Sequence, residues 1–413
     1  MRYLYNAGIY LYNMLLHIAA PFNEKAAAML SGRRETFGKL DGCFKKGDRV
    51  FWFHCSSLGE FEQGRPVMEK IKDEQPEIKI LLSFYSPSGY SVRHNYDRAD
   101  VVVYLPADTM RNARRFISMA RPEKAIFIKY EFWFNYLAVL QKRQIPLYLI
   151  SGIFRPSQTF FSWYGRYFLK ILKGFTRLFV QDSDSAAILQ KHGIDNYTVS
   201  GDTRFDRVMA VSRASEKIPL IEKFSSGSRI IVAGSSWPAE EEIIVRYMGK
   251  GRTDMKYIIA PHNIADSNID RIERLLELPC IRYSELDGHN VPPDVKVLII
   301  DSIGILSSVY RYADIAVIGG GFGRGIHNIL EAATWAVPVM FGPRHEKFKE
   351  ALDLIELGGA VVFDSYEAFS AAADSLLDDA GMLEAAGMAA RTYINNNLGA
   401  SDKISEELLT RNC

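Results

Sequence analysis

Two glutamates each follow an apolar, strand-like run in the first half of the chain. Glu60 ends the short loop 56–60 behind the run Arg49 to Cys55, and Glu131 follows the run Lys124 to Lys129. A carboxylate in hydrogen-bond reach of a hydroxyl can take its proton while that hydroxyl attacks an activated sugar carbon. A carboxylate with an ordinary pKa is ionised near pH 7, so this role requires no raised pKa.

Each glutamate also has a plainer interpretation. Ser57 with Glu60 three residues later matches a helix capping box. Gly59 in the same loop would permit an unusual backbone geometry that aims Glu60 inward. Glu131 lies between Tyr130 and the pair Phe132-Trp133, where an apolar shell or a cationic partner would shift its pKa; the alternative is a partly exposed glutamate in a surface aromatic cluster.

The second half carries a glycine-rich turn, residues 319–325, between a predicted strand at Asp314 to Ile318 and a predicted helix at Asn328 to Ala336. Glycines let backbone N–H groups approach a phosphate, and a helix N-terminus favours an anion there. Residues 234–236 follow another predicted strand and offer two hydroxyls, or an N-cap. Glu331 is placed either to hold ribose hydroxyls or to stabilise the helix dipole.

Composition excludes several classes of function. The 413 residues carry a net charge of only +1, which gives no electrostatic case for nucleic acid. The four cysteines are scattered without a CxxC pair, so neither a zinc site nor a disulfide framework is predicted. Asp182-Ser183-Asp184 is typical of a capped turn rather than of a metal site. We therefore expect neither a metal nor a cofactor, and a reducing cytosol fits.

Alternating strands and helices in both halves predict an α/β fold of two doubly wound, Rossmann-like domains. We place a surface helix at 1–22, the first domain at 23–210, a linker at 211–226 and the second domain at 227–413, with a last helix that can return to the first domain. Ligands of such sheets bind beyond the carboxyl ends of the strands. Both glutamates and both glycine-containing turns follow strands, so we expect them to line one shared cleft.

The first helix has an unusual pattern. Leu4 to Ala20 is largely apolar, but Asn6, Asn13 and His17 form a narrow polar stripe. This pattern favours an amphipathic helix lying in a membrane surface, with basic residues close behind it to attract anionic head groups: Lys25, Arg33, Arg34, Lys39, Lys45, Lys46 and Arg49. The alternative is a helix packed on the protein's own core.

An ordered set of motifs runs over nearly the whole chain and resembles the 3-deoxy-D-manno-octulosonic acid (Kdo) transferases of lipopolysaccharide biosynthesis. The motifs are Ser57-Leu58-Gly59-Glu60 with Gly64-Arg65-Pro66, Tyr130-Glu131-Phe132-Trp133, Gly201-Asp202-Thr203-Arg204-Phe205-Asp206, Ala233-Gly234-Ser235-Ser236, and His327-Asn328-Ile329-Leu330-Glu331-Ala332-Ala333 with Gly342-Pro343. The resemblance implies a GT-B fold and inverting, metal-independent transfer from CMP-Kdo to a lipid A precursor (lipid IVA). It also implies a peripheral or monotopic enzyme at the cytoplasmic face of the bacterial inner membrane.

The same resemblance assigns roles. Glu60 falls at the general base, and Glu131 at a second essential acid on the acceptor side. Acceptor contacts fall to Ser57, Gly59, Arg65 and Tyr130, and donor contacts to Arg204, Gly234, Ser235, Ser236, His262, Gly319, Gly320, Gly321, Asn328, Glu331 and Arg344. The chain departs from the family pattern at Trp237-Pro238 and at Pro261-His262-Asn263. Two rival functions remain: a nucleotide-sugar 2-epimerase on the same fold, and a catalytically silent binder of lipid or nucleotide.

Overall fold

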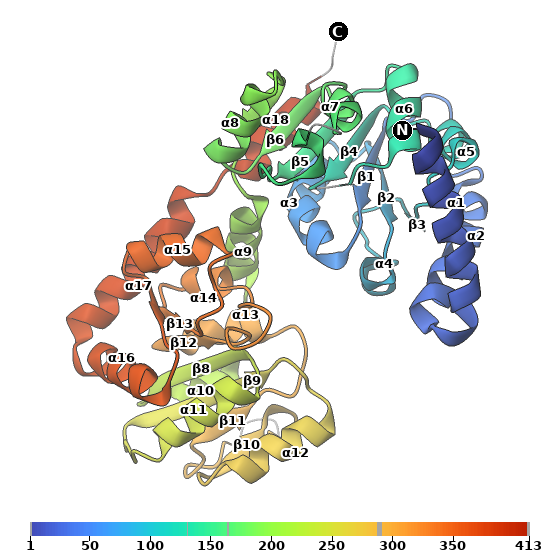
Figure 1. The fold of residues 1–413 in the computed structure, drawn as a ribbon. Helices are drawn as coiled ribbons and strands as arrows, with labels where there is room; N and C mark the ends of the chain where they lie inside the picture. The colour runs from blue at the N-terminus through green and yellow to red at the C-terminus, as the bar shows by residue number, and fades with distance from the viewer. Residues whose placement is uncertain (1, 130, 163–164, 287–290, 411–413) are drawn as a thin grey trace. The chain divides into compact units, whose positions relative to one another are not determined.

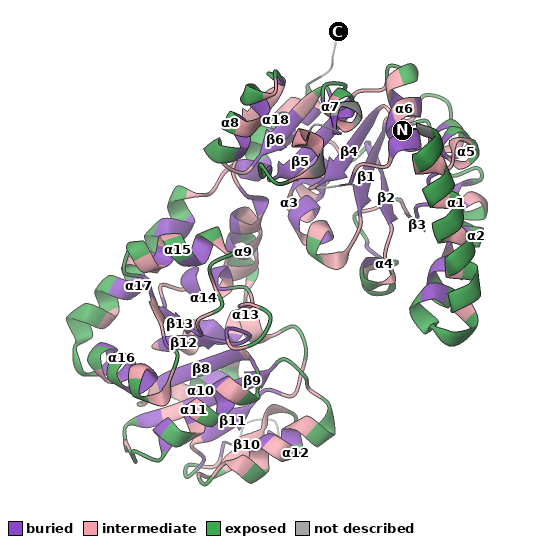
Figure 2. Ribbon diagram, in the orientation of Figure 1, coloured by how far each residue is buried: buried purple, intermediate pink, exposed green. Residues whose placement is uncertain are grey.

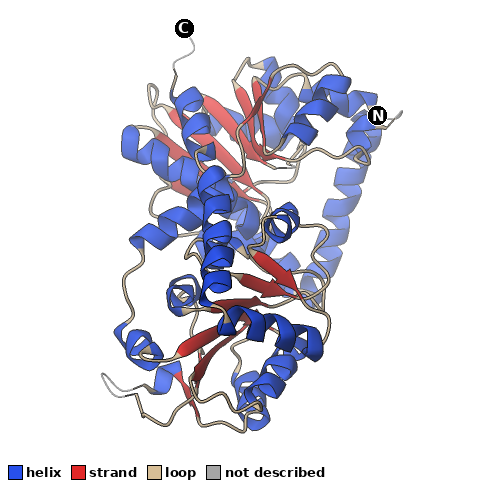
Figure 3. Ribbon diagram, turned by 90° about the vertical axis from the view of Figure 1, so that its left-hand side faces the viewer, coloured by secondary structure: helices blue, strands red, loops and turns tan. Residues whose placement is uncertain are grey.

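The computed structural model describes residues 2–129, 131–162, 165–286 and 291–410 (Figure 1). The chain forms two compact units. The first comprises residues 1–207 and 398–413, and the second comprises residues 208–397. Each unit is built around its own seven-stranded parallel sheet with helices on both faces (Figures 1 and 3).

The sheet of the first unit has the order β3-β2-β1-β4-β5-β6-β7. Its inner strands are apolar runs that are buried on both faces, as expected for a parallel sheet covered by helices. The strands are β1 (Val50–Cys55), β2 (Lys79–Phe84), β3 (Val101–Tyr104), β4 (Lys124–Ile128), β5 (Leu147–Gly152), β6 (Arg177–Val180) and β7 (Tyr197–Val199).

The helices of the first unit begin with three that precede the sheet in sequence, and the last one comes from the far end of the chain. They are α1 (Arg2–Ala19), η1 (Ala20–Phe22), α2 (Glu24–Leu40), α3 (Leu58–Glu74), α4 (Pro87–Arg93), α5 (Met110–Ala120), α6 (Phe134–Lys142), η2 (Thr159–Phe161), α7 (Arg166–Leu172), α8 (Ser183–Lys191), α9 (Thr203–Ala214, which runs into the second unit) and α18 (Ala400–Leu409). Ile404 and Leu408 of α18 are fully buried in the core of the first unit beside Phe61 of α3. The C-terminal helix is therefore a structural part of this unit.

The sheet of the second unit has the order β10-β11-β9-β8-β12-β13-β14. Its strands are β8 (Arg229–Ser236), β9 (Met255–Pro261), β10 (Cys280–Arg282), β11 (Val297–Ile299), β12 (Ile315–Ile318), β13 (Val339–Phe341) and β14 (Ala360–Val362). Its helices are α10 (Pro219–Ser225), α11 (Pro238–Met248), α12 (Asp266–Leu275), η3 (Tyr283–Glu285), α13 (Leu306–Val309), η4 (Tyr310–Tyr312), α14 (Leu330–Ala333), α15 (Lys349–Glu356), α16 (Tyr366–Asp378) and α17 (Ala380–Asn396).

Both sheets change winding direction beside their first strand, between β1 and β4 in the first unit and between β8 and β12 in the second. Such a switch point is where open α/β sheets bind ligands. Glu60 and Glu131 follow β1 and β4, and residues 234–236 and 319–321 lie at the ends of β8 and β12. The predicted fold class is confirmed, and the residues singled out from the sequence flank the switch point of their own sheet.

Some predicted elements differ in length. The segment 211–226 is mostly helical, and Ile221 and Phe224 of α10 are fully buried in the second unit. The helix predicted at 328–336 is the short α14, preceded by a loop that is shaped by the glycines before it. Asp182 is the N-cap of α8, where its Oδ1 accepts a hydrogen bond from the Ser185 N–H at 2.7 Å, so the interpretation as a capped turn is confirmed.

The first helix turns its apolar side outward. Asn6 and Asn13 are half-buried, and Asn6 Oδ1 accepts a hydrogen bond from Asn135 Nδ2 at 2.9 Å. Most other positions of α1 are exposed (Figure 2), including Leu4, Tyr10, Leu11, Met14, Leu15 and Ile18. This orientation contradicts the alternative of a helix that buries its apolar face in the protein's own core. No helix within the described ranges is long and apolar enough to cross a bilayer.

Candidate active site

Glu60 lies in the first turn of α3, and its side chain folds back to the chain that enters the helix. Its Oε2 accepts a hydrogen bond from the backbone N–H of Ser56, but the Ser57 side chain makes no capping bond, so a full capping box is absent. Gly59 has no left-handed φ, and a Cβ built on it would meet nothing within 4 Å. The expectation that Gly59 supplies an unusual backbone geometry is therefore wrong. What it leaves is open space beside Glu60.

The pKa of Glu60 is raised to about 7, mainly by burial and then by the negative charge of Glu131. The Ser56 N–H and the cation of Lys129 act in the opposite direction but do not outweigh these two effects. The pKa of Glu60 is therefore higher than the ordinary carboxylate value that the sequence analysis used. The fold places a second carboxylate near a half-buried one, which disfavours charge on the first.

Glu131 is buried, with 8% of its surface exposed, and ends a chain of buried polar groups. The Trp133 indole Nε1–H lies 2.7 Å from Glu131 Oε2 and 2.8 Å from His54 Nε2. On the other side of its ring, His54 Nδ1 lies 3.1 Å from the backbone oxygen of Ser83. Because an indole N–H only donates, His54 Nε2 accepts from it, and Nδ1 then carries the proton that is donated to Ser83.

His54 and Trp133 were not predicted as site residues. His54 lies inside the apolar run of β1 and is fully buried. A histidine near the carboxyl end of a fully apolar strand is the signal that would have found it, since a buried imidazole requires polar partners. Trp133 connects His54 with Glu131 and thereby sets the position of the acid.

Two cationic side chains also belong to this edge of the first sheet. Lys129 follows β4 with a left-handed φ of 66°, and burial, then the nearby charge of Arg204, lowers its pKa. Arg204 lies in the first turn of α9 and in the first unit, where its Nε donates to Asp202 Oδ2 at 2.7 Å. The structure thus places Arg204, which was predicted to bind the donor, in the same unit as Glu60.

The remaining acceptor-side predictions are placed as follows. Ser57 is half-buried at the start of α3. Arg65, one turn beyond Glu60, donates through Nε to Glu69 Oε1 at 2.6 Å and is thus held by an ion pair within its own helix. Tyr130 lies outside the described residues.

In the second unit, glycines at the carboxyl ends of β8 and β12 are required by close packing. A Cβ on Gly234 would lie 1.7 Å from the Tyr310 hydroxyl, and one on Gly319 would lie 2.0 Å from the backbone oxygen of Ser235. A Cβ on Gly321 would lie 2.5 Å from the Gly342 nitrogen. These positions therefore need glycine whether or not a ligand binds, a role that the sequence pattern did not distinguish from phosphate binding.

Two buried glutamates hold these turns in place. Gly320, with a left-handed φ of 93°, donates its N–H to Glu240 Oε1 at 2.9 Å. Ser236 Oγ donates to Glu241 Oε1 at 2.8 Å. Both glutamates are almost fully buried, and neither was among the site residues predicted from the sequence. Ser235 also has a left-handed φ, of 51°.

The other predicted donor residues surround the glycine-rich turn. Arg344 donates its N–H to the Gly321 oxygen at 2.9 Å and Nη1 to the Gly323 oxygen at 2.8 Å. Asn328 Nδ2 donates to Glu331 Oε1 at 2.9 Å. The structure therefore brings Arg344 onto the same turn as Gly319, Gly320 and Gly321, and links Asn328 with Glu331 at the start of α14.

His262 lies at the end of β9 in a cluster of three rings. Its ring centroid lies 4.8 Å from that of Trp237 and 4.5 Å from that of His327, and Trp237 Nε1 donates to His327 Nε2 at 3.0 Å. The His262 N–H donates to the Ser236 oxygen at 3.0 Å. The two departures from the family pattern, at Trp237 and at His262, thus lie at one place in the structure, because the two side chains stack on each other.

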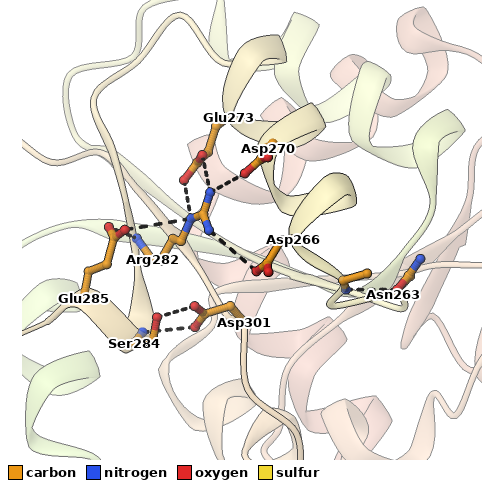
Figure 4. Close-up of polar contacts among 9 residues, drawn as sticks. Asn263, Asp266, Asp270, Glu273, Arg282, Ser284, Glu285 and Asp301 are labelled. Atoms are coloured by element: carbon orange, nitrogen blue, oxygen red, sulfur yellow. Dashed lines mark hydrogen bonds and ion pairs between the residues drawn. The ribbon is translucent and has the colours of Figure 1, made fainter.

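At the corner of the second unit formed by β10 and α12, several carboxylates surround the single cation of Arg282 (Figure 4). Arg282 Nη2 binds Asp270 at 2.6 Å and Glu273 at 2.7 Å. Asp266 and Glu285 lie at 4.0 and 3.9 Å from its other nitrogens. This network ties the strand to the helix, and its excess of carboxylates makes the corner unsuited to an anionic ligand.

Comparison with solved structures defines the class of fold. The chain superimposes with a TM-score of 0.61 on a UDP-GlcNAc 2-epimerase from Neisseria meningitidis, at 17% identity and covering 88% of this chain and all of the other. A glycosyltransferase from Rickettsia africae superimposes with a TM-score of 0.56, at 15% identity, covering 88% of this chain and all of the other. At these identities the likeness concerns the fold alone, which is of the GT-B type.

The sequence comparisons point to one family. Residues 31–207 match the family model described as 3-deoxy-D-manno-octulosonic-acid transferase (kdotransferase). The chain is 26% identical over 374 residues to the 3-deoxy-D-manno-octulosonic acid transferase of Bordetella pertussis, covering 86% of each, and 27% identical over 318 residues to that of Aquifex aeolicus, covering 75% of this chain and 81% of the other. Residues 31–207 thus carry the domain of the Kdo transferases, and over most of its length the chain is similar to enzymes of that name.

Proposed function

We propose that this protein transfers Kdo from CMP-Kdo to a hydroxyl of a lipid A precursor such as lipid IVA, with inversion and without a metal or cofactor. The observation that carries the proposal is the glutamate pair at the switch point of the first sheet. Glu60 has a pKa of about 7 there, close to the pH at which it would work. A general base is most effective when its pKa lies near the operating pH.

The proposed reaction is a direct displacement. The ionised Glu60 takes the proton of the acceptor hydroxyl while the hydroxyl oxygen bonds to the anomeric carbon and the CMP phosphate leaves from the opposite side. The Ser56 N–H holds one carboxylate oxygen and so limits the rotation of the Glu60 side chain. Glu131, buried and fixed by Trp133, is proposed to position the acceptor.

The leaving phosphate needs fixed donors where its charge develops. In the second unit, the Ser235 hydroxyl and the Arg344 guanidinium lie at the turns that follow β8 and β12, whereas the Gly319 and Gly320 N–H groups already donate to Gly234 and Glu240. We assign the donor nucleotide to these residues, together with His262, Asn328 and Glu331. Glu240 and Glu241 support this assignment, because they hold two of the turns in one conformation.

The acceptor is a lipid, and we propose that α1 brings the enzyme to the cytoplasmic face of the inner membrane as a peripheral protein. The support is the outward apolar side of α1. Basic residues that follow α1 contribute less than the sequence pattern suggested. Arg33 is buried, and Arg49 forms two hydrogen bonds with Glu123, so neither is an exposed surface charge.

Replacing Leu11 and Leu15 by Asp is expected to weaken binding to phosphatidylglycerol vesicles about a hundredfold. Each leucine is 53% exposed, and burying a leucine side chain contributes about 1.5–3 kcal/mol. Vesicle sedimentation measures the change. Met388→Asp, at a position of similar exposure (52%) in the second unit, is the control and should bind as the wild type does. Equal binding by all three proteins would remove α1 from membrane contact.

The proposed reaction itself is tested by mass spectrometry of lipid IVA incubated with CMP-Kdo and the protein. An increase of the lipid mass by one or more Kdo residues supports transfer and excludes a silent binder. A nucleotide sugar converted to its epimer without any lipid product would instead assign the chain to the epimerase rival.

A further inference from the structure

Arg33 is a buried cation without an acidic partner in the described part of the chain. It lies in α2 with 8% of its surface exposed, and across the described ranges none of its three guanidinium nitrogens makes a well-aligned hydrogen bond, although the Tyr85 hydroxyl lies close. An arginine stays protonated at any ordinary pH, and burying an unpaired charge costs several kcal/mol. A group of this kind requires a reason, and a ligand that the chain itself does not supply is one.

The position of Arg33 is set closely. Its neighbour Gly32 packs against the ring of Tyr104, where a Cβ would lie 2.1 Å from a ring carbon. Thr36, one turn further, donates its hydroxyl to the Tyr104 oxygen at 2.8 Å. These contacts seat α2 at the end of β3 and hold Arg33 at the carboxyl edge of the first sheet.

Arg33 continues the group of residues around Glu131. Its guanidinium carbon lies 4.6 Å from the centroid of the Tyr85 ring, and Tyr85 stacks on Trp133 with centroids 4.2 Å apart and planes 25° apart. Trp133 in turn donates to Glu131. Tyr85 follows β2 and donates its N–H to the oxygen of Cys55, the last residue of β1, shortly before the helix that carries Glu60.

The acids and the arginine at the carboxyl edge of the first sheet therefore differ in their polar partners. The two acids, Glu60 and Glu131, are engaged by Ser56 and Trp133. Arg33 is separated from Glu131 by the rings of Tyr85 and Trp133, and it contacts the ring and the hydroxyl of Tyr85. A guanidinium binds a phosphate through two parallel hydrogen bonds.

We propose that Arg33 binds a phosphate group of the acceptor lipid and thereby selects phosphorylated acceptors; this inference rests on the proposed function. Tyr12 of α1 controls access, because it is 41% exposed and lies against Tyr85. Burial, and then the hydrogen bond with Tyr12, raise the pKa of Tyr85 to about 12, although the charge of Arg33 acts in the opposite direction. A rotamer change of Tyr12, a surface side chain, frees the Tyr85 hydroxyl, which then joins Arg33 in binding the phosphate.

The test compares lipid IVA with lipid IVA that a phosphatase has dephosphorylated, both in neutral detergent micelles. Binding is measured by calorimetric titration and transfer by steady-state kinetics. Arg33→Gln is expected to raise Kd and KM for the phosphorylated lipid at least about tenfold, and to leave both constants for the dephosphorylated lipid and kcat unchanged. Arg34→Gln is the matched control, because it removes the same charge from an exposed neighbour in the same helix and should change neither lipid's constants.

Two results would overturn the proposal: equal weakening for both lipids, which marks a structural role, or no weakening for either. If Arg33→Gln does not fold, Arg33→Lys decides by the same comparison, since it keeps the charge but loses the two parallel bonds. Phosphatidylglycerol micelles serve as a competitor. If they compete at the wild type but not at Arg33→Gln, the residue binds phospholipid head groups instead. Because binding is read without turnover, a failure of transfer in the wild type refutes the proposed function and leaves the Arg33 comparison intact.

Discussion

Replacing Glu60 by Gln is expected to lower kcat for Kdo transfer on the order of a thousandfold while CMP affinity stays near that of the wild type. Loss of a general base costs about 10² to 10⁴ in rate. The amide has the shape of the carboxyl group and can still accept the hydrogen bond from the Ser56 N–H, so the start of α3 keeps its conformation. CMP affinity is unchanged because the donor nucleotide is assigned to residues of the second unit.

Glu74→Gln in the same helix is the matched control, since it makes the same chemical change at an exposed position and should be silent. Single-turnover transfer assays give the rate, and calorimetric titration gives the CMP affinity. Full activity of Glu60→Gln would remove Glu60 from the mechanism. Loss of activity together with loss of CMP binding would show a folding defect instead.

The pH dependence follows from the raised pKa. Glu60 acts as a base only when ionised, so kcat/KM of the wild type should fall as the pH drops through about 7. The charge of Glu131 is the second cause of the raised pKa, after burial. Glu131→Gln should therefore move this acidic limb to lower pH, in addition to lowering the rate. An acidic limb at the same pH in both proteins would assign it to another group.

The arrangement of the two sheets was predictable because runs such as 50–55 and 79–84 are apolar almost throughout, and such runs are typical of strands buried on both faces. The positions of Glu60 and Glu131 at a switch point followed from their places after strands. The pKa of Glu60 did not follow, because it depends on burial and on the approach of Glu131 from a strand far along the chain. Local spacing contains neither quantity.

The same limit applies to charge and polarity at the N-terminal helices. The sequence pattern showed that Asn6, Asn13 and His17 share a stripe, but not that Asn6 and Asn13 are half-buried against the protein while His17 stays exposed. It also grouped Arg33 with exposed basic residues, although the approach of Gly32 to Tyr104 buries it. The contacts of His54 with Trp133 join segments that are distant in sequence, and no local pattern contains them.

Replacing Gly319 by Ala is expected to destabilise the second unit by about 3 kcal/mol and to weaken CMP binding with it. The added Cβ would lie 2.0 Å from the Ser235 oxygen and 2.7 Å from the Ser236 Cα, which are backbone atoms of β8 and its turn. Backbone atoms in the middle of a sheet move only if the ladder between β8 and β12 yields. The substitution therefore displaces the turn 234–236, which we assign to the donor nucleotide, although the added methyl group itself need touch no ligand.

Gly323→Ala in the same turn separates this effect from a general intolerance of the glycine-rich segment. Its Cβ would have nothing closer than the Gly320 oxygen at 3.5 Å, and its φ is not left-handed, so stability and CMP affinity should stay close to those of the wild type. Hydrogen exchange of the β8 and β12 amides measures the local stability of the second sheet, and that of β1 and β4 should be unchanged in both variants. If the β8 and β12 amides of Gly319→Ala exchange as slowly as those of the wild type and the variant binds CMP equally well, the turns 234–236 and 319–321 can shift more easily than their close contacts imply. Their glycines would then serve the approach of the phosphate and not the contact between the two strands.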